Sequence, residues 1–248
     1  MREVTVRFGG VVALDNLSFS IGEGEICALI GPNGAGKTTL FNVVSRVYDP
    51  TLGAVSFDGH DLLSLDAHEI AKVGVGRTFQ NLALWKGLSV LENVMVGMHT
   101  ASKVSFLTAV LRIGLKKEEA RLRERAMSVL DELGLGAYAH HAAAGLPFGT
   151  LKRVELARAV VSEPRLLLLD EPASGLTHSE VDELAEVIRS VQQSRNLTVL
   201  LVEHHMQMVM GISDRIVVLD FGRKIAEGLP QEIQRDERVI EAYLGAPA

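Results

Sequence analysis

Three short runs of the chain are apolar at nearly every position: Ile26–Ile30, Leu166–Leu169 and Thr198–Val202. This pattern is typical of strands buried on both faces, because both alternating sets of side chains then meet a hydrophobic layer. The three runs alternate with stretches that have helical spacing. The pattern therefore predicts an α/β fold built on a mostly parallel sheet.

Weaker patterns complete the set of expected elements. Further strands are expected at Val4–Arg7, Leu17–Ile21, Ala54–Phe57, Val75–Phe79, Ile216–Leu219 and Lys224–Glu227. Helices are expected at Lys37–Ser45, Lys117–Leu133, Ser179–Ser194 and Arg238–Leu244. The early strands and the tail predict a mixed sheet added to the parallel core. Residues 81–146 contain no convincing strand, so we expect a helical subdomain there, inserted within a single domain that spans residues 1–248.

Composition narrows the class of protein. Of 248 residues, 47% are hydrophobic and 23% are charged, which is ordinary globular usage. The single cysteine, Cys27, forms no intrachain disulfide and favours a reducing compartment. We expect no secretion signal, because no N-terminal stretch combines a basic start, an apolar middle and a small-residue cleavage site. The sequence also contains no apolar run of 18 residues. A formal net charge of −6 argues against a general nucleic-acid coat, although it permits one local phosphate site.

A phosphate-binding motif follows the first buried strand. The segment Gly31, Pro32, Asn33, Gly34, Ala35, Gly36, Lys37, Thr38 and Thr39 matches the pattern G-x-x-x-x-G-K-[ST]. Its glycines allow backbone N–H groups to turn inward around phosphates, and the following helix adds its positive end. Lys37 would reach the β- and γ-phosphates, and the Thr38 hydroxyl would ligate Mg²⁺. The alternative is a glycine-rich turn, but the buried strand before it and the helix after it favour the phosphate loop.

Two other buried strands also end in polar residues. Asp170 and Glu171 follow Leu166–Leu169, and His204 follows Thr198–Val202. Ligands bind at the carboxyl ends of parallel strands, so Asp170 is expected to hold Mg²⁺ beside the phosphate loop. Glu171 would then orient or deprotonate the attacking water, and His204 would contact the γ-phosphate. A solvated acidic turn and a structural histidine are the alternatives.

These residues resemble the ATP-binding-cassette (ABC) ATPases, and the resemblance covers essentially the whole chain. It implies a P-loop NTPase core, with Gly31–Thr39 as the Walker A loop and Asp170-Glu171 as the end of Walker B. Gln80 resembles the family's glutamine that contacts Mg²⁺ and the attacking water, and His204 resembles its switch histidine. Phe8 falls where the family places an aromatic ring that stacks on adenine. A core position for Phe8 is the alternative.

The signature segment departs from the usual family form L-S-G-G-Q. Here it is Leu146-Pro147-Phe148-Gly149-Thr150, so Gly149 is the glycine that the resemblance places on the γ-phosphate of an opposing subunit. Thr150 is expected to cap a helix that begins near Leu151. Thr177 also departs from the Asp or Asn that is usual in the family. The resemblance therefore does not extend to the contacts through which the family's two subunits communicate.

Three further segments resemble the ATPases of branched-chain amino acid importers, namely residues 81–146, 201–215 and 240–245. The resemblance implies an ATP-hydrolysing subunit that uses ATP and Mg²⁺ and works at the cytoplasmic face of the inner membrane as a peripheral protein. Its implied partners are a second ABC ATPase subunit (a different chain or a second copy), integral membrane permease subunits and, indirectly, a periplasmic or extracellular substrate-binding protein. Nucleic acid is not an expected partner. The alternatives are another substrate (urea, amides or exported lipid), a non-transport ABC ATPase, and a nucleotide-binding regulator that does not hydrolyse.

Overall fold

The computed structural model describes residues 1–78, 82–98 and 115–244. At its centre lies a six-stranded sheet with the order β11-β10-β3-β9-β8-β7. The strands are β3 (Ile26–Ile30), β7 (Val75–Arg77), β8 (Leu166–Asp170), β9 (Thr198–Val202), β10 (Arg215–Asp220) and β11 (Arg223–Gly228). Strand β11 is antiparallel to β10, and all other neighbours are parallel. This arrangement confirms the predicted α/β fold with a mixed sheet.

Strand β8 shows why the central strands are apolar at every position. Leu167 and Leu169 pack into a hydrophobic core shared with the helices on one face of the sheet. Leu166 and Leu168 pack into a second core on the opposite face. Successive side chains of a strand point to opposite faces, so a sheet covered on both sides requires an uninterrupted apolar run.

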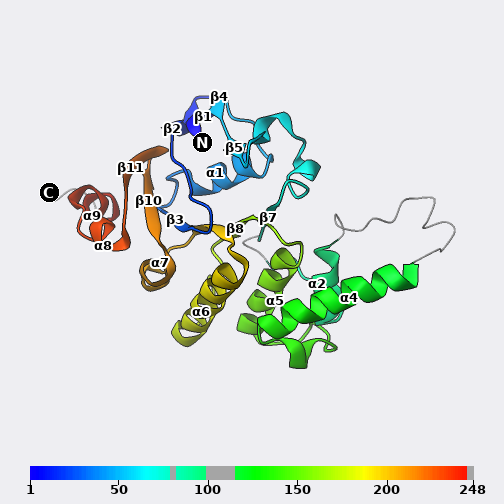
Figure 1. Ribbon diagram of the computed structural model, residues 1–248. Helices are drawn as coiled ribbons and strands as arrows, with labels where there is room; N and C mark the ends of the chain where they lie inside the picture. The colour runs from blue at the N-terminus through cyan, green and yellow to red at the C-terminus, as the bar shows by residue number, and fades with distance from the viewer. Residues whose placement is uncertain (79–81, 99–114, 245–248) are drawn as a thin grey trace.

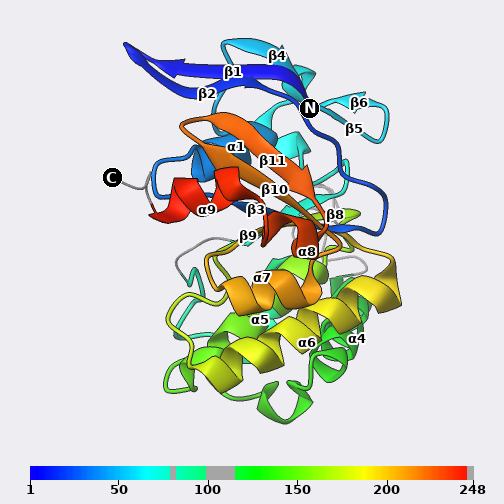
Figure 2. The same cartoon turned by 90° about the vertical axis from the view of Figure 1, so that its left-hand side faces the viewer.

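The second core lies between the central sheet and the amino-terminal elements. A three-stranded antiparallel sheet has the order β2-β1-β4, and a separate hairpin pairs β5 with β6. The elements are β1 (Arg2–Phe8), β2 (Val11–Leu17), β4 (Leu52–Ala54), β5 (Ser56–Phe57), β6 (His60–Asp61), α1 (Lys37–Val44) and the 3₁₀ turns η1 (Leu62–Ser64) and η2 (Ala67–Glu69). Helix α1 lies between this antiparallel layer and the central sheet (Figure 2).

Helices cover the opposite face of the central sheet (Figure 1). They are α2 (Val90–Val96), α4 (Leu115–Glu132), α5 (Phe148–Val160), α6 (His178–Arg195) and α7 (Met206–Ile212), with the 3₁₀ turn η3 (Gly136–Tyr138). Helices α2 and α4 come between β7 and β8 in the chain, and α5 packs against both of them. The carboxyl-terminal helices α8 (Pro230–Ile233) and α9 (Glu237–Leu244) lie beside β10 and β11.

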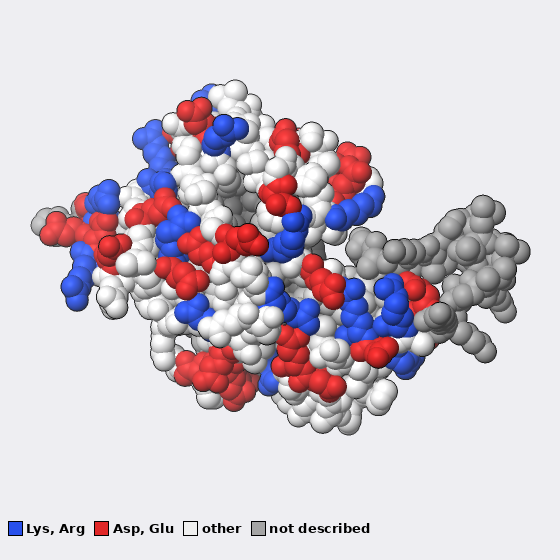
Figure 3. All heavy atoms as spheres, viewed as in Figure 1, with Lys and Arg blue, Asp and Glu red and all other residues white. Residues whose placement is uncertain are grey.

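Side chains of both charges are interspersed over the face shown in Figure 3. Among the helices that the structure describes, none is both long and apolar enough to cross a bilayer.

Two of the expected strands are placed wrongly by the sequence pattern. Phe8 pairs with Val11 across the two-residue turn Gly9-Gly10, so the second strand begins at Val11 and ends at Leu17 instead of starting there. The expected strand Ala54–Phe57 is divided, because β4 pairs with β1 whereas β5 pairs with β6. In both cases the partner strand determines the boundaries, and local hydrophobicity does not report the partner.

Candidate functional site

The carboxyl ends of β3, β8 and β9 meet at one edge of the central sheet. Strand β9 lies between the other two, and its residue Val202 is paired with Leu29 on one side and with Asp170 on the other. The segments that leave these strands are the glycine-rich loop, the acidic pair and the pair Glu203-His204. The topology therefore brings together three segments that are separated by up to 173 positions in the sequence, as predicted for ligand sites in parallel sheets.

Two glycines of the loop 31–36 hold positions that another residue cannot occupy without strain. Gly31 has φ 153°, and a Cβ atom there would lie 2.1 Å from the carbonyl oxygen of Leu219. Gly36 has φ 101°, and its Cβ would lie 2.6 Å from the carbonyl oxygen of Ala13. The loop is thus pressed against β2 and β10, which fixes its curvature.

Lys37 begins α1 and folds back over the loop. Its Nζ atom donates hydrogen bonds to the carbonyl oxygens of Gly31 at 2.6 Å and Pro32 at 2.9 Å. Burial lowers the pKa of Lys37, although the carboxylates of Glu171 and Asp170 act in the opposite direction. An amino group in this position is ready to transfer from loop carbonyls to phosphate oxygens.

The remaining motif residues follow the loop into the helix. Asn33, Gly34 and Ala35 form the turn itself, while Thr38 and Thr39 lie in the first turn of α1. The first-turn N–H groups of a helix have no acceptor within the helix, and the aligned peptide dipoles make this end positive. The structure thus gives this loop both features of an anion site.

Asp170 ends β8 and is almost fully buried, with 5% of its surface exposed. Burial raises the pKa of Asp170, and the guanidinium of Arg77 partly offsets this effect. The Nη2 atom of Arg77 lies 3.1 Å from Oδ2 of Asp170. A buried carboxylate beside a phosphate loop offers the kind of oxygen ligand that a Mg²⁺ ion takes.

Glu171 and His204 leave neighbouring strands and face each other. The Oε1 atom of Glu171 lies 3.8 Å from Nδ1 of His204, whose side chain is largely exposed. Glu171 has φ 48°, a left-handed conformation that is uncommon for a residue with a side chain. Its backbone N–H donates to the carbonyl oxygen of Val202 at 2.8 Å. The strained backbone is thus held by the neighbouring strand, as is common for residues of active sites.

Phe8 ends β1 at the surface, with 46% of its area exposed. Its ring contacts Tyr48 edge to face, with the centroids 5.2 Å apart. The core position considered as the alternative is therefore wrong for Phe8. An exposed aromatic pair of this kind is able to take a flat ring on its free face. Gln80, the other residue expected to contact the nucleotide, lies outside the described residues.

Gly149 lies in the first turn of α5, which begins at Phe148. The expected cap at Thr150 is wrong, because Pro147 occupies the N-cap position and places Thr150 inside the helix. The backbone N–H of Gly149 bonds with the carboxylate of Glu180. Glu180 also completes a capping box with Thr177 at the start of α6. Thr177 is therefore the N-cap residue of α6, and both its hydroxyl and its backbone N–H bond the carboxylate of Glu180.

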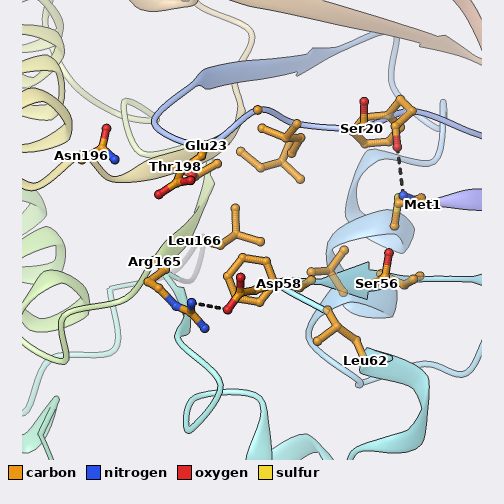
Figure 4. Close-up of a pocket in the computed structure, with 17 residues that line it drawn as sticks. Met1, Ser20, Glu23, Ser56, Asp58, Leu62, Arg165, Leu166, Asn196 and Thr198 are labelled. Carbon is orange, nitrogen blue, oxygen red and sulfur yellow. Dashed lines mark hydrogen bonds and ion pairs between the residues drawn. The ribbon is translucent and has the colours of Figure 1, made fainter. Parts of the chain in front are cut away.

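A separate cavity of about 380 Å³ lies at the opposite edge of the sheet (Figure 4). Leu166 and Thr198, the first residues of β8 and β9, line it together with Phe19 and Phe57. Arg165 forms an ion pair with Asp58 at its side. Because the acidic pair and the histidine follow the carboxyl ends of the same strands, this cavity does not belong to the candidate nucleotide site.

Three contributors to the site were not anticipated from the sequence. Arg77 ends β7 and binds Asp170. Glu203 is buried beside His204. The side chain of Tyr243 in α9 meets the backbone of Gly31. A charged residue in or next to an apolar strand is a signal for the first two, since such a charge must find a partner. The sequence offers no comparable signal for Tyr243.

Comparison with known sequences agrees with this geometry. The sequence family described as ABC transporter matches residues 14–174, and that described as branched-chain amino acid ATP-binding cassette transporter matches residues 223–248. The chain is 41% identical over 243 residues to the high-affinity branched-chain amino acid transport ATP-binding protein BraF of Pseudomonas aeruginosa, covering 98% of this chain and 95% of the relative. It is 41% identical over 241 residues to LivG of Escherichia coli, covering 97% of this chain and 94% of the relative.

Solved structures give the same result. The ADP conformation of MJ1267, an ATP-binding cassette of an ABC transporter, matches with a TM-score of 0.84 and 29% identity, covering 99% of this chain and 97% of that one. A dimeric structure of the cassette MJ0796, bound to ADP and Pi, matches with a TM-score of 0.76 and 26% identity, covering 92% and 97%.

Proposed function

The chain belongs to the ABC transporter family of ATP-binding cassettes, and on that premise we propose that it powers an importer of branched-chain amino acids. It is an ATPase whose hydrolysis is coupled to transport across a membrane. The observation that carries the ATPase role is the meeting of Lys37, Asp170 and Glu171 at one sheet edge. The match of residues 223–248 to the branched-chain amino acid family supports the substrate class.

The triphosphate of ATP binds in the loop Gly31–Thr39. Lys37 leaves the carbonyl oxygens of Gly31 and Pro32 and bonds phosphate oxygens instead. The backbone N–H groups of the loop and of the first turn of α1 bind the same phosphates. Phe8 stacks on the adenine, because its exposed ring ends the strand that precedes β2 and the loop.

Thr38, Asp170 and Gln80 would hold the magnesium ion of the nucleotide. Asp170 fits this role, because burial raises its pKa and so makes its ionised form costly. A bound Mg²⁺ ion would stabilise that ionised form. Thr38 offers a hydroxyl at the first turn of α1. The bound metal supplies charge neutralisation for the phosphate oxygens.

Glu171 orients and deprotonates the water that attacks the γ-phosphate. Its side chain is only partly exposed, and the bond from its N–H to the carbonyl oxygen of Val202 ties its backbone to β9. His204 bonds the γ-phosphate. Its Nδ1 atom lies 3.8 Å from Oε1 of Glu171, so both side chains act at the same phosphate. One residue thus acts on the water and the other on the phosphate.

A complete ATP site requires a second ABC ATPase subunit. Gly149 and the first turn of α5 act on the nucleotide of that partner, whether the partner is a different chain or a second copy. The cassette MJ0796 is a relative whose dimeric structure is known. Closing and opening of the two subunits moves integral membrane permease subunits, which receive their cargo from a periplasmic or extracellular substrate-binding protein. The subunit is peripheral and lies at the cytoplasmic face of the inner membrane, where ATP is available.

Residues 81–146 form the helical subdomain that meets the permeases. This division of the chain is supported by α2 and α4, which lie between β7 and β8 in the sequence. Helix α5 follows this range in the chain and packs against both helices. Trp85 stands at the beginning of the subdomain and exposes half of its surface.

Reconstitution tests this function. The chain is purified together with its membrane and substrate-binding proteins, and the complex is reconstituted into liposomes. ATP is enclosed in the liposome lumen, which corresponds to the cytoplasm, and uptake of labelled leucine is measured. We expect leucine to stimulate ATP hydrolysis and to accumulate. Stimulation by urea, short amides or lipid instead would contradict the substrate class, and hydrolysis that is independent of any membrane partner would contradict the transport role.

A further inference from the structure

Glu203 follows the last residue of β9 and has 1% of its surface exposed. A charged side chain is rarely buried to this extent unless it has partners, because removing a carboxylate from water carries a large free-energy cost. Its immediate neighbour, His204, is exposed. The two residues therefore face different environments, and the side chain of Glu203 points into the protein instead of toward solvent.

Three backbone N–H groups donate to the carboxylate of Glu203. Its Oε2 atom accepts from His204 at 2.7 Å and from His205 at 2.9 Å. Its Oε1 atom accepts from Ala173 at 2.8 Å. The first two donors belong to the segment that follows β9, whereas Ala173 belongs to the segment that follows β8. One side chain thus joins the two segments that carry Glu171 and His204.

The arrangement requires a group that accepts hydrogen bonds at both ends. A carboxylate has two oxygen atoms and no donor, so it satisfies all three N–H groups. A glutamine in the same place keeps one oxygen and presents an NH₂ group to the remaining N–H, which leaves at least one buried donor without an acceptor. Hydrogen bonds from backbone N–H groups to a carboxylate are also stronger than those to a neutral amide.

The junction lies close to the reacting groups. Ala173 is two residues from Glu171, and His204 is adjacent to Glu203 in the chain. The side chains of Glu171 and His204 are 3.8 Å apart at their nearest titratable atoms. Misplacement by about 1 Å of groups that must act together reduces the rate of a reaction about a hundredfold.

We propose that Glu203 is a positioning residue, which holds the segment of Glu171 and the segment of His204 in the mutual arrangement that hydrolysis requires. This inference rests on the proposed roles of Glu171 and His204. Glu203 itself touches neither nucleotide nor water in this scheme. Its effect should therefore fall on the turnover of bound ATP and leave the affinity for ATP unchanged, since the loop 31–36 and Lys37 have other supports.

The test compares Glu203→Gln with Gln192→Leu in the full chain, assembled with its partner subunits. Gln192 is a matched control, because it is also buried and its Nε2 atom donates to the carbonyl oxygen of Gly24 at 2.5 Å, on the opposite edge of the sheet. For Glu203→Gln we expect kcat to fall at least tenfold while the dissociation constant for magnesium-ATP stays within about threefold of wild type. For Gln192→Leu we expect a loss of thermal stability with both values retained.

A second readout is independent of activity. In NMR spectra of the full chain, the amide protons of Ala173, His204 and His205 should shift upfield and exchange faster in Glu203→Gln, because they lose a charged acceptor. An unchanged kcat, or an equal loss of kcat and affinity, would overturn the positioning role. If the wild-type chain itself fails to bind magnesium-ATP, the proposed function is wrong, and the amide signals alone still decide whether Glu203 joins the two segments.

Discussion

The guanidinium of Arg77 lies 3.1 Å from the carboxylate of Asp170, measured from Nη2 to Oδ2. Its Nη1 atom donates to Oδ1 of Asn42 and to Oγ of Ser45, both at 2.9 Å. Asn42 belongs to α1, which directly follows the phosphate loop, and Ser45 is the C-cap residue of that helix. Arg77 therefore connects the helix that begins with Lys37 to the strand that ends with Asp170.

Replacing Arg77 with Met should weaken the response to Mg²⁺ in a pH-dependent manner. Burial already raises the pKa of Asp170, and the guanidinium lowers it, so its loss raises the pKa further. The Asp170 carboxyl then gives up its proton less readily, and this effect is larger at lower pH. We expect the Mg²⁺ concentration for half-maximal ATPase activity to rise most at pH 6.5 and to approach the wild-type value at pH 8.5.

The control for this variant is Arg223→Met, which removes an exposed ion pair with Asp15. Exposed ion pairs contribute little, so its Mg²⁺ response should match that of wild type at every pH. A constant ratio between Arg77→Met and wild type from pH 6.5 to 8.5 would contradict the role of Arg77 in keeping Asp170 ionised.

Replacing Glu171 with Gln should separate binding from turnover. The amide cannot take a proton from water, whereas the phosphate loop remains intact. General bases contribute about a hundredfold to ten-thousandfold, so we expect kcat to fall at least a hundredfold with magnesium-ATP affinity retained. Single-turnover hydrolysis and equilibrium binding measure the two quantities. Wild-type turnover by this variant would remove Glu171 from the catalytic role.

Two glycines of the phosphate loop should respond differently to alanine. At Gly31 the new Cβ would lie 2.1 Å from the carbonyl oxygen of Leu219, so the backbone must shift. We expect Gly31→Ala to lower the free energy of unfolding by about 3 kcal/mol and to abolish ATP binding. At Gly34, φ is 82° but nothing lies within 4 Å, so Gly34→Ala should lose only about 1 kcal/mol. Urea unfolding measures both, and equal losses would refute the steric explanation.

Cys27 should make the chain less stable in alkaline solution. It is fully buried in β3, and burial raises its pKa from 9.0 to about 12. Above pH 9 the unfolded chain releases this proton while the folded chain keeps it, so a rise in pH favours unfolding. Each pH unit between 9 and 12 then lowers the free energy of unfolding by about 1.4 kcal/mol.

The measurement compares wild type with Cys27→Ala by urea unfolding at pH 8 and pH 10. Other groups also titrate in this range, but they do so in both proteins. Between the two pH values, wild type should lose about 1.4 kcal/mol more than the variant. Parallel losses would show that the thiol ionises equally well in the folded chain.

Trp85 should contribute to the assembly with membrane subunits more than to folding. Half of its surface is exposed, and Arg158 lies over its ring. The buried side chain of Asn93 bonds the backbone N–H of Trp85 at 2.8 Å and its carbonyl at 3.1 Å, so the position of the residue does not depend on the indole. We expect Trp85→Ala to change the melting temperature little and to reduce co-purification of the permease subunits at least tenfold. Leu229→Ala, which trims another exposed apolar side chain, is the control and should leave assembly intact. Full assembly of Trp85→Ala would contradict this role.

The central strands and the phosphate motif could be predicted from the amino-acid sequence alone. Ile26–Ile30 and Thr198–Val202 match β3 and β9 residue for residue, because strands buried on both faces leave an unmistakable apolar run. The helix after Gly36 begins at Lys37, as predicted. These features are local, because each depends only on residue types at neighbouring positions in the chain.

Features that depend on contacts between distant segments became visible only in the folded chain. The second strand begins at Val11 because Phe8 pairs with it, and no periodicity reports that pairing. Arg77 meets Asp170 across 93 positions, and Glu203 meets Ala173 across 30. The sequence shows that such charges must find partners, since burial without them is too costly, but the order of strands in the sheet selects which partners they find.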